Sequence, residues 1–216
     1  MHNLVDLKAL EREERLENFH VALIDCNPES LAIYEKQIVA LSRVSTTRLL
    51  LDDLHEQADA AATLAHYDLI VTTSTHYAEL CGMFPRAVGR MVQAVVSPRQ
   101  ETLIDLARIG SSQAVGVMCQ SDTFLRIIRD KLQDLHIPSS RVTHLSTESE
   151  GDLGRFLRAC NVVVVPPGYS LVRRREHVAD VQAFRAGGGK VIVFDYQIER
   201  GSMLQIEDRI RTLLNQ

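Results

Sequence analysis

The chain has 216 residues, of which 45% are hydrophobic and 24% are charged, so it is long enough for one large domain or two small α/β lobes. Its formal net charge of −4 excludes a global electrostatic attraction for DNA or acidic membranes. No apolar run approaches the ~20 residues that a membrane-spanning helix needs, and the N-terminus lacks the apolar core of a secretory signal. Four widely spaced cysteines without a CxxC pair indicate reduced thiols rather than a disulfide framework or structural zinc. We therefore expect a cytoplasmic protein without a membrane partner.

Short apolar runs alternate with helical patterns through the first half of the chain. The charged segment at 4–17 has leucines at roughly helical spacing, which predicts an amphipathic linker helix within residues 1–18. Asn27 and Pro28 stand where a helix N-cap and first helical position are expected. Strands are predicted at 20–25, 45–51, 68–74 and within 86–97, and helices from Pro28 to Leu41, at 52–67 and at 76–83.

The second half repeats this alternation. Strands are predicted at 113–119, 141–146, 161–167 and 190–196, and helices at 101–109, 121–137, 149–160, 170–186 and 201–214. Continuous apolar strands between helices are typical of parallel sheets covered on both faces. We predict an α/β fold with two Rossmann-like lobes, 19–96 and 97–196, and a cleft between them, with the helix at 201–216 packed back on the first lobe. The alternative is one continuous sheet of about eight strands.

Polar side chains follow most of the predicted strands, where ligands of open parallel sheets bind. The stretch "TTSTHY" places four hydroxyl residues and His76 at the end of the third strand. This stretch has no glycine and no following lysine, so it is not a phosphate-binding loop. It is either one wall of a ligand pocket or a turn that caps its own helix.

The sequence also bears on three other kinds of site: the phosphorylation site of a receiver domain, the paired thiols of a racemase and a metal site. The run "VALIDCNPES" resembles the first strand and acidic turn of a receiver domain, but threonine stands where the third strand should end in a phosphorylatable aspartate. Cys26 and Cys119 each follow the first strand of a half, which resembles the paired thiols of cofactor-independent racemases. No metal site is expected, because no HxH or HExxH motif occurs and no acidic residue stands at ligand spacing beside a histidine.

A series of segments is similar in order and spacing to one family of regulators. "DLIVTTSTHYAEL", "VVSPRQETLIDLARI", "AVGVMCQSDTFLRIIRDKLQDLHI", "NVVVVPPGYS" and "KVIVFDYQIERGSM" resemble the C-terminal effector domain of GntR-type bacterial transcription regulators, a domain similar to periplasmic binding proteins. The resemblance implies a two-lobed sensor of a small effector, working as a homodimer. It also implies that DNA is bound only through an N-terminal winged helix-turn-helix that this chain does not contain.

The leading hypothesis is therefore a non-enzymatic sensor, without a cofactor, that binds a small polar or anionic metabolite between its lobes and transmits the rearrangement to a DNA-binding domain. The alternative is a racemase-like or isomerase-like enzyme that uses Cys26 or Cys119. The candidate ligand-binding residues of the first half and the crossover are Asn27, Thr73, Ser74, Thr75, His76 and Ser97. Those of the second half are Gln120, Ser121, Tyr169 and Asp195, with the Tyr169 ring expected to stack on the ligand.

Overall fold

A computed structural model describes residues 15–148 and 153–215 and divides the chain into two compact units. The first unit runs to Ser97 and includes the segment from Gln197 onward, and the second spans Pro98–Tyr196. Each unit contains its own four-stranded parallel sheet, which confirms the α/β fold with two Rossmann-like sheets. The alternative of one continuous sheet is wrong. Most of the predicted linker helix, residues 1–14, lies outside the described residues.

The first unit is built on a sheet with the strand order β2-β1-β3-β4. Its strands are β1 (His20–Asp25), β2 (Ser45–Leu50), β3 (Leu69–Thr73) and β4 (Met91–Ala94). Its helices are α2 (Pro28–Ser42), α3 (Leu51–Glu56), α4 (Ala60–Ala65), α5 (Ser74–Met83), the 3-10 helix η1 (Pro85–Arg90) and α10 (Arg200–Leu214).

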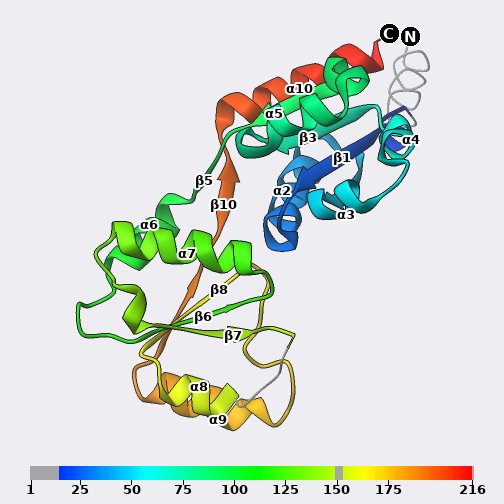
Figure 1. Ribbon diagram of the computed structural model, residues 1–216. Helices are drawn as coiled ribbons and strands as arrows, with labels where there is room; N and C mark the ends of the chain where they lie inside the picture. The colour runs from blue at the N-terminus through cyan, green and yellow to red at the C-terminus, as the bar shows by residue number, and fades with distance from the viewer. Residues whose placement is uncertain (1–14, 149–152, 216) are drawn as a thin grey trace, which may run out of the picture. The chain divides into compact units, whose positions relative to one another are not determined.

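Helices cover both faces of this first sheet, and as a result β1 is buried from Val21 onward and β3 is buried throughout. Ala22, Ile24 and Ile70 belong to a core to which α3, α4 and α5 contribute apolar side chains. The long helix α2 packs on β1 and β2, while α10 packs on β4 and α2 (Figure 1). The C-terminal helix is therefore part of the first unit.

The second unit repeats this arrangement with the strand order β7-β6-β8-β9. Its strands are β6 (Val115–Cys119), β7 (Val142–Ser146), β8 (Val162–Val165) and β9 (Lys190–Val193). Its helices are α6 (Gln100–Ala107), α7 (Asp122–Asp134), the 3-10 helix η2 (Ser139–Arg141), α8 (Leu153–Arg158) and α9 (His177–Ala186). Figure 1 shows α6 and α7 on one face of the sheet and α8 and α9 on the other.

Each face of the second sheet has its own packing. Phe124 of α7 meets Phe194 and Tyr196 in edge-to-face contacts, with ring centroids 5.8 and 6.3 Å apart. On the other face α8 and α9 pack against β6 and β8. There the Cβ of any residue at Gly116 would lie 2.5 Å from Phe156 Cζ. The glycine therefore lets α8 approach β6 closely.

A short two-stranded ribbon carries the chain across the boundary of the units. It pairs β5 (Val96–Pro98) with β10 (Tyr196–Ile198), and the boundary passes through both strands. In the first unit Ser202 Oγ accepts a hydrogen bond from Val95 N at 2.9 Å. In the second unit Thr102 Oγ1 accepts one from Asp195 N at 3.2 Å. Side-chain hydrogen bonds thus attach the ribbon's flanks to their own units.

Two helices differ from the sequence prediction. The single helix predicted at 52–67 is two, because Asp59 Oδ1 accepts a hydrogen bond from Ala62 N at 3.2 Å and starts α4 as a new helix. The helix predicted at 170–186 begins only at His177, after the basic run.

Every helix among the described residues is too short or too polar to span a bilayer.

Candidate functional site

The strand order of the first sheet creates a topological switch point between its two inner strands, β1 and β3. The chain moves from β1 to β2 on one side and then to β3 on the other, so the connections after β1 and β3 leave in opposite directions. The crevice at such a topological switch point, beyond the carboxyl ends of the strands, is where open α/β sheets bind ligands. Ile24 of β1 pairs with Thr72 of β3, so both strands end at the same level.

Asp25 is the last residue of β1 and its side chain is buried, with only 4% of the residue exposed. Its Oδ1 accepts hydrogen bonds from Asn27 N at 3.2 Å and Asn27 Nδ2 at 3.3 Å. Burial raises the pKa of Asp25 above its ordinary value of 3.8, although His76 and the hydrogen bonds from residues 26 and 27 oppose the rise. The sheet therefore holds a desolvated carboxyl group at the carboxyl end of β1.

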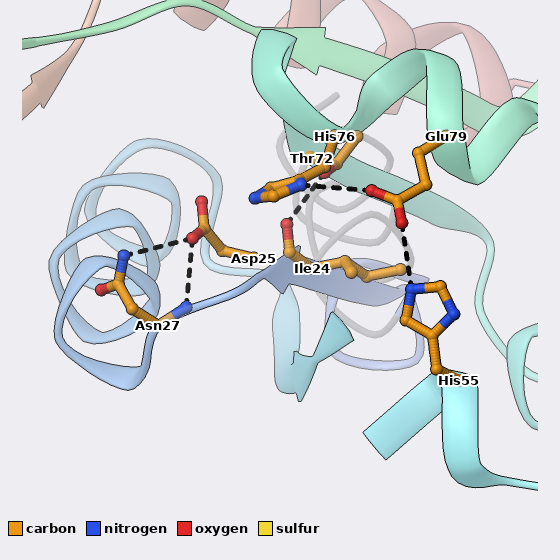
Figure 2. Close-up of polar contacts among 7 residues, drawn as sticks. All are labelled: Ile24, Asp25, Asn27, His55, Thr72, His76 and Glu79. Atoms are coloured by element: carbon orange, nitrogen blue, oxygen red, sulfur yellow. Dashed lines mark hydrogen bonds and ion pairs between the residues drawn. The ribbon is translucent and has the colours of Figure 1, made fainter. Parts of the chain in front are cut away.

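Asn27, a predicted site residue, serves both the helix and the site. Its Oδ1 accepts a hydrogen bond from Ser30 N at 2.7 Å and caps α2, as the sequence predicts for this position. Its amide nitrogen faces Asp25 (Figure 2). One buried side chain thus links the start of α2 to the orientation of the Asp25 carboxylate.

His76 lies in the first turn of α5, and its ring stands between two carboxylates (Figure 2). Its Nδ1 is 3.5 Å from Glu79 Oε2, one turn along the helix. The other oxygen of Glu79 is 3.0 Å from His55 Nε2. Only 13% of the His76 side chain is exposed, compared with 45% for His55. The imidazole therefore has a fixed orientation at a largely enclosed position.

Cys26 completes a compact group of three. One ligand atom each from Asp25, Cys26 and His76 lies within 4.8 Å of the other two. Burial and the negative charge of Asp25 raise the pKa of the Cys26 thiol to about 11. At pH 7 about one Cys26 in 10,000 is then a thiolate. In this state the group offers a thiol, a carboxyl and an imidazole rather than a nucleophile.

The four hydroxyl residues of "TTST" are divided between two elements. Thr72 and Thr73 end β3 and are buried, and Thr72 Oγ1 donates a hydrogen bond to Ile24 O at 2.9 Å. Ser74 and Thr75 are exposed in the first turn of α5. Thr72 therefore joins the two strands internally, while Ser74 and Thr75 stand on the solvent side of the edge.

Three predicted residues of the second unit, Gln120, Ser121 and Tyr169, follow the ends of β6 and β8, which flank its own switch point. Ser121 Oγ caps α7 by accepting a hydrogen bond from Phe124 N at 3.1 Å. Gln120 is exposed, and its Nε2 donates to Glu148 Oε1 at 2.7 Å. The Arg173 guanidinium lies 5.4 Å from the centroid of the Tyr169 ring.

The remaining predicted residues, Ser97 and Asp195, lie in and beside the ribbon. Ser97 Oγ donates a hydrogen bond to Glu199 Oε1 within the first unit. Asp195 Oδ2 pairs with Arg99 Nε at 2.7 Å within the second. Both side chains already serve as anchors of the ribbon.

Sequence reasoning did not select Asp25, Glu79 or His55. Asp25 was visible at a strand end, but nothing in the sequence distinguishes a buried carboxylate from an exposed one there. The contact between His55 and Glu79 joins residues 24 positions apart on separate helices, and no spacing rule indicates it.

An apolar groove of about 590 Å³ lies elsewhere in the first unit, between α4 and η1. Leu64 and Phe84 are among its lining residues, and Arg86 and Arg90 bring positive charge to it. It shares no lining residue with the carboxyl edge of β1 and β3.

Comparison with known proteins gives the second half of the chain a family likeness. Residues 116–216 match the sequence profile of the YmtS Rossmann-like domain family. No curated protein matches the chain by sequence. The chain is similar to a solved structure of an NtrC family transcriptional regulator from Clostridium acetobutylicum, with 12% identity, 91% of this chain and 97% of that chain covered, and a TM-score of 0.32.

A second solved structure is a periplasmic binding ribose operon repressor protein from Lactobacillus acidophilus. It has 10% identity and a TM-score of 0.34, with 87% of this chain and 99% of that chain covered. The fold class rests on the family match and on the two parallel sheets described above.

Proposed function

We propose that the chain is a sensor domain that binds a small polar metabolite at the switch point of its first sheet. The carrying observation is the convergence of Asp25, Asn27 and His76 at the carboxyl ends of β1 and β3. A buried carboxylate, an amide and a fixed imidazole are the few convergent polar groups that small-ligand sites use for orientation. The raised pKa of the buried Asp25 carboxyl is a shift of the kind that clusters at functional sites.

The charges around the site favour one part of the predicted ligand class. Asp25 and Asp52 both act on Cys26 through their negative charge, and Glu79 stands beside His76. An anionic ligand would meet repulsion here, whereas a hydroxyl or amino group could donate to the carboxylates. We therefore propose a neutral or amino-bearing metabolite. That one effector contacts both units stays a prediction.

A regulatory output is part of the proposal. The order of segments resembles GntR-type effector domains, and the pKa of the Cys26 thiol at the proposed site is raised rather than lowered. We propose that the effector shifts a conformational equilibrium of a homodimeric transcription regulator, which requires unequal affinity for the two states. DNA would be bound by a separate winged helix-turn-helix domain.

A cysteine-dependent enzyme is the second candidate. Cys119 Sγ lies 3.6 Å from His144 Nε2 at the end of β6, which is a thiol–imidazole pair of the kind that activates a nucleophile. Cys119 is fully buried, however, and the pKa of Cys26 is raised rather than lowered. Both observations favour binding over catalysis.

A thermal-shift screen tests the proposal. Chelator-treated protein would be screened against hydroxylated and amino-bearing metabolites, and each stabilising compound retested on His76→Ala and on the control His66→Ala. His66 is an exposed histidine of the same unit, outside the site. A ligand at 100 times its Kd should stabilise the chain by about 2.7 kcal/mol. We expect that gain in the chain and in His66→Ala, but not in His76→Ala. Equal stabilisation of both variants would place the ligand elsewhere.

A further inference from the structure

Three side chains of different chemistry meet at the end of β1. A carboxylate oxygen, a sulfur and a ring nitrogen from Asp25, Cys26 and His76 all lie within 4.8 Å of one another. Tetrahedral zinc has bonds of about 2.0–2.3 Å to such atoms, so its ligand atoms are about 3.3–3.8 Å apart. Side-chain rotations that bring the three atoms about 1 Å closer together would complete a three-ligand set.

Neighbouring polar groups already orient two of the three ligands. Asn27 donates two hydrogen bonds to Oδ1 of Asp25. Glu79 stands beside Nδ1 of His76, and Figure 2 shows Nε2 on the side of the ring that faces Asp25. His55 in turn contacts the second oxygen of Glu79. Metal-binding histidines commonly place their other nitrogen against a carboxylate in this way.

We propose that Asp25, Cys26 and His76 bind one divalent transition-metal ion of the zinc type. The thiolate and imidazole select zinc-like metals over Mg²⁺ and Ca²⁺, which prefer oxygen ligands. Binding releases the thiol proton of Cys26 to solvent, and the carboxylate and thiolate together balance the two charges of the ion. The sequence predicted no metal site, because His76 stands 50 positions or more beyond the other two ligands.

Three protein ligands leave a fourth position open, as in catalytic rather than structural zinc sites. An oxygen or nitrogen of the effector would occupy that position. This last step rests on the proposed function, whereas the ion itself requires only the chain's own side chains.

A cobalt titration tests the metal site. Reduced, chelator-treated full chain would be titrated with Co²⁺ and followed in the near ultraviolet, where a cobalt–thiolate bond absorbs. We expect a thiolate-to-cobalt band that saturates at one ion per chain and is bleached by Zn²⁺. Cys26→Ser should lose the band, while Cys160→Ser, a buried cysteine of the second unit, should keep it.

Two further variants distinguish the metal ligand His76 from Glu79, which orients it. We expect His76→Ala to weaken Co²⁺ binding by at least tenfold and Glu79→Gln by about tenfold, the usual effect of losing an outer-shell partner. His66→Ala should bind as the unaltered chain does. Circular dichroism shows that each variant is folded.

The proposal is overturned if the folded chain gives no thiolate band, or if the band survives in Cys26→Ser. A missing band together with metabolite binding in chelator would reject the metal and leave the sensor proposal standing. A band that saturates at one ion per chain, without any metabolite that stabilises the chain, would support the metal site and reject the sensor proposal.

Discussion

Asp25 carries a carboxyl group into the protein interior at the end of β1, and the fold gives it only partial compensation. Two hydrogen bonds from Asn27 and the nearby His76 favour its charged form, yet burial outweighs them and raises its pKa. A buried polar group that opposes stability is typical of a site retained for binding. Its neighbours then decide what it can bind.

Replacing Asp25 by asparagine should therefore stabilise the metal-free chain. Asparagine keeps the shape and an acceptor for Asn27 but removes the desolvated charge. Because the folded pKa is raised, the native carboxyl is least costly below pH 3.8 and most costly above its folded pKa. We expect Asp25→Asn to gain roughly 0.5–2 kcal/mol of unfolding free energy at pH 7. In urea unfolding the gain should shrink as the pH falls and vanish at about pH 3, and the exposed control Asp53→Asn should show neither effect. A loss of stability at pH 7 would contradict this account of the site.

The raised pKa of Cys26 predicts slow alkylation. With a pKa of about 11, its modification by iodoacetamide should still rise with pH at pH 10, whereas the rate for a free thiol, whose pKa is about 8.5, levels off about one pH unit above that value. At pH 8.5 we expect a rate at least about tenfold below that of free cysteine, after allowing for the higher nucleophilicity of a basic thiolate. Mass spectrometry of the peptide that contains Cys26 measures it. A rate equal to that of free cysteine would show that the thiol is not held as described.

At the scale of elements, the buried strands and the helix starts with a capping side chain at Asn27 and Ser121 are what the sequence predicts best. The apolar runs locate β1, β3, β6 and β8 because buried parallel strands are continuous hydrophobic stretches. Asn27 and Ser121 cap α2 and α7 as their residue types indicate. The break between α3 and α4 was missed, since alanine-rich sequence favours helix and the cap at Asp59 competes with it locally.

For the candidate site, the sequence predicts which strand ends meet but not how the side chains are oriented there. Strand ends of a parallel sheet converge, so Asn27 and His76 could be expected near one another. The rotation of α5 that turns His76 toward Asp25 and places Glu79 behind it depends on tertiary packing. That packing cannot be predicted from the local sequence.

The cap of α2 predicts a graded mutant series. Asn27→Ala removes the acceptor for Ser30 N and the amide that holds Asp25, and should cost about 1–2 kcal/mol of unfolding free energy. Asn27→Ser keeps a capping oxygen and should lose less. Urea unfolding measures both, with Ser121→Ala as the matched cap in the second unit. Equal losses for Ala and Ser would show that capping is not the main role of Asn27.

At the scale of the whole molecule, two separately packed units share one chain. Each has its own parallel sheet and its own hydrophobic core, and the chain crosses between them twice through the β5–β10 ribbon. Such units open locally with their own free energies. A packing defect in one should therefore leave the core of the other protected.

Gly116→Ala tests that independence. The new Cβ would lie 2.5 Å from Phe156 Cζ and 2.7 Å from Cys160 Sγ, so these two side chains must move, at a cost of typically 1–3 kcal/mol. Hydrogen exchange should show lost protection in β6 and β8 and unchanged protection in β1 and β3. Gly201→Ala, with open space around its Cβ, is the control. Loss of protection in both sheets would show that the units unfold together.

Hydrogen exchange with a bound effector addresses the binding site itself. A metabolite that stabilises the chain would be added at saturation, and amide exchange compared with and without it. Binding at the switch point predicts slower exchange at the amides that follow β1 and β3, those of residues 26, 27, 29, 30 and 74–78. Slower exchange confined to the groove between α4 and η1, with these amides unchanged, would contradict the assignment of the site.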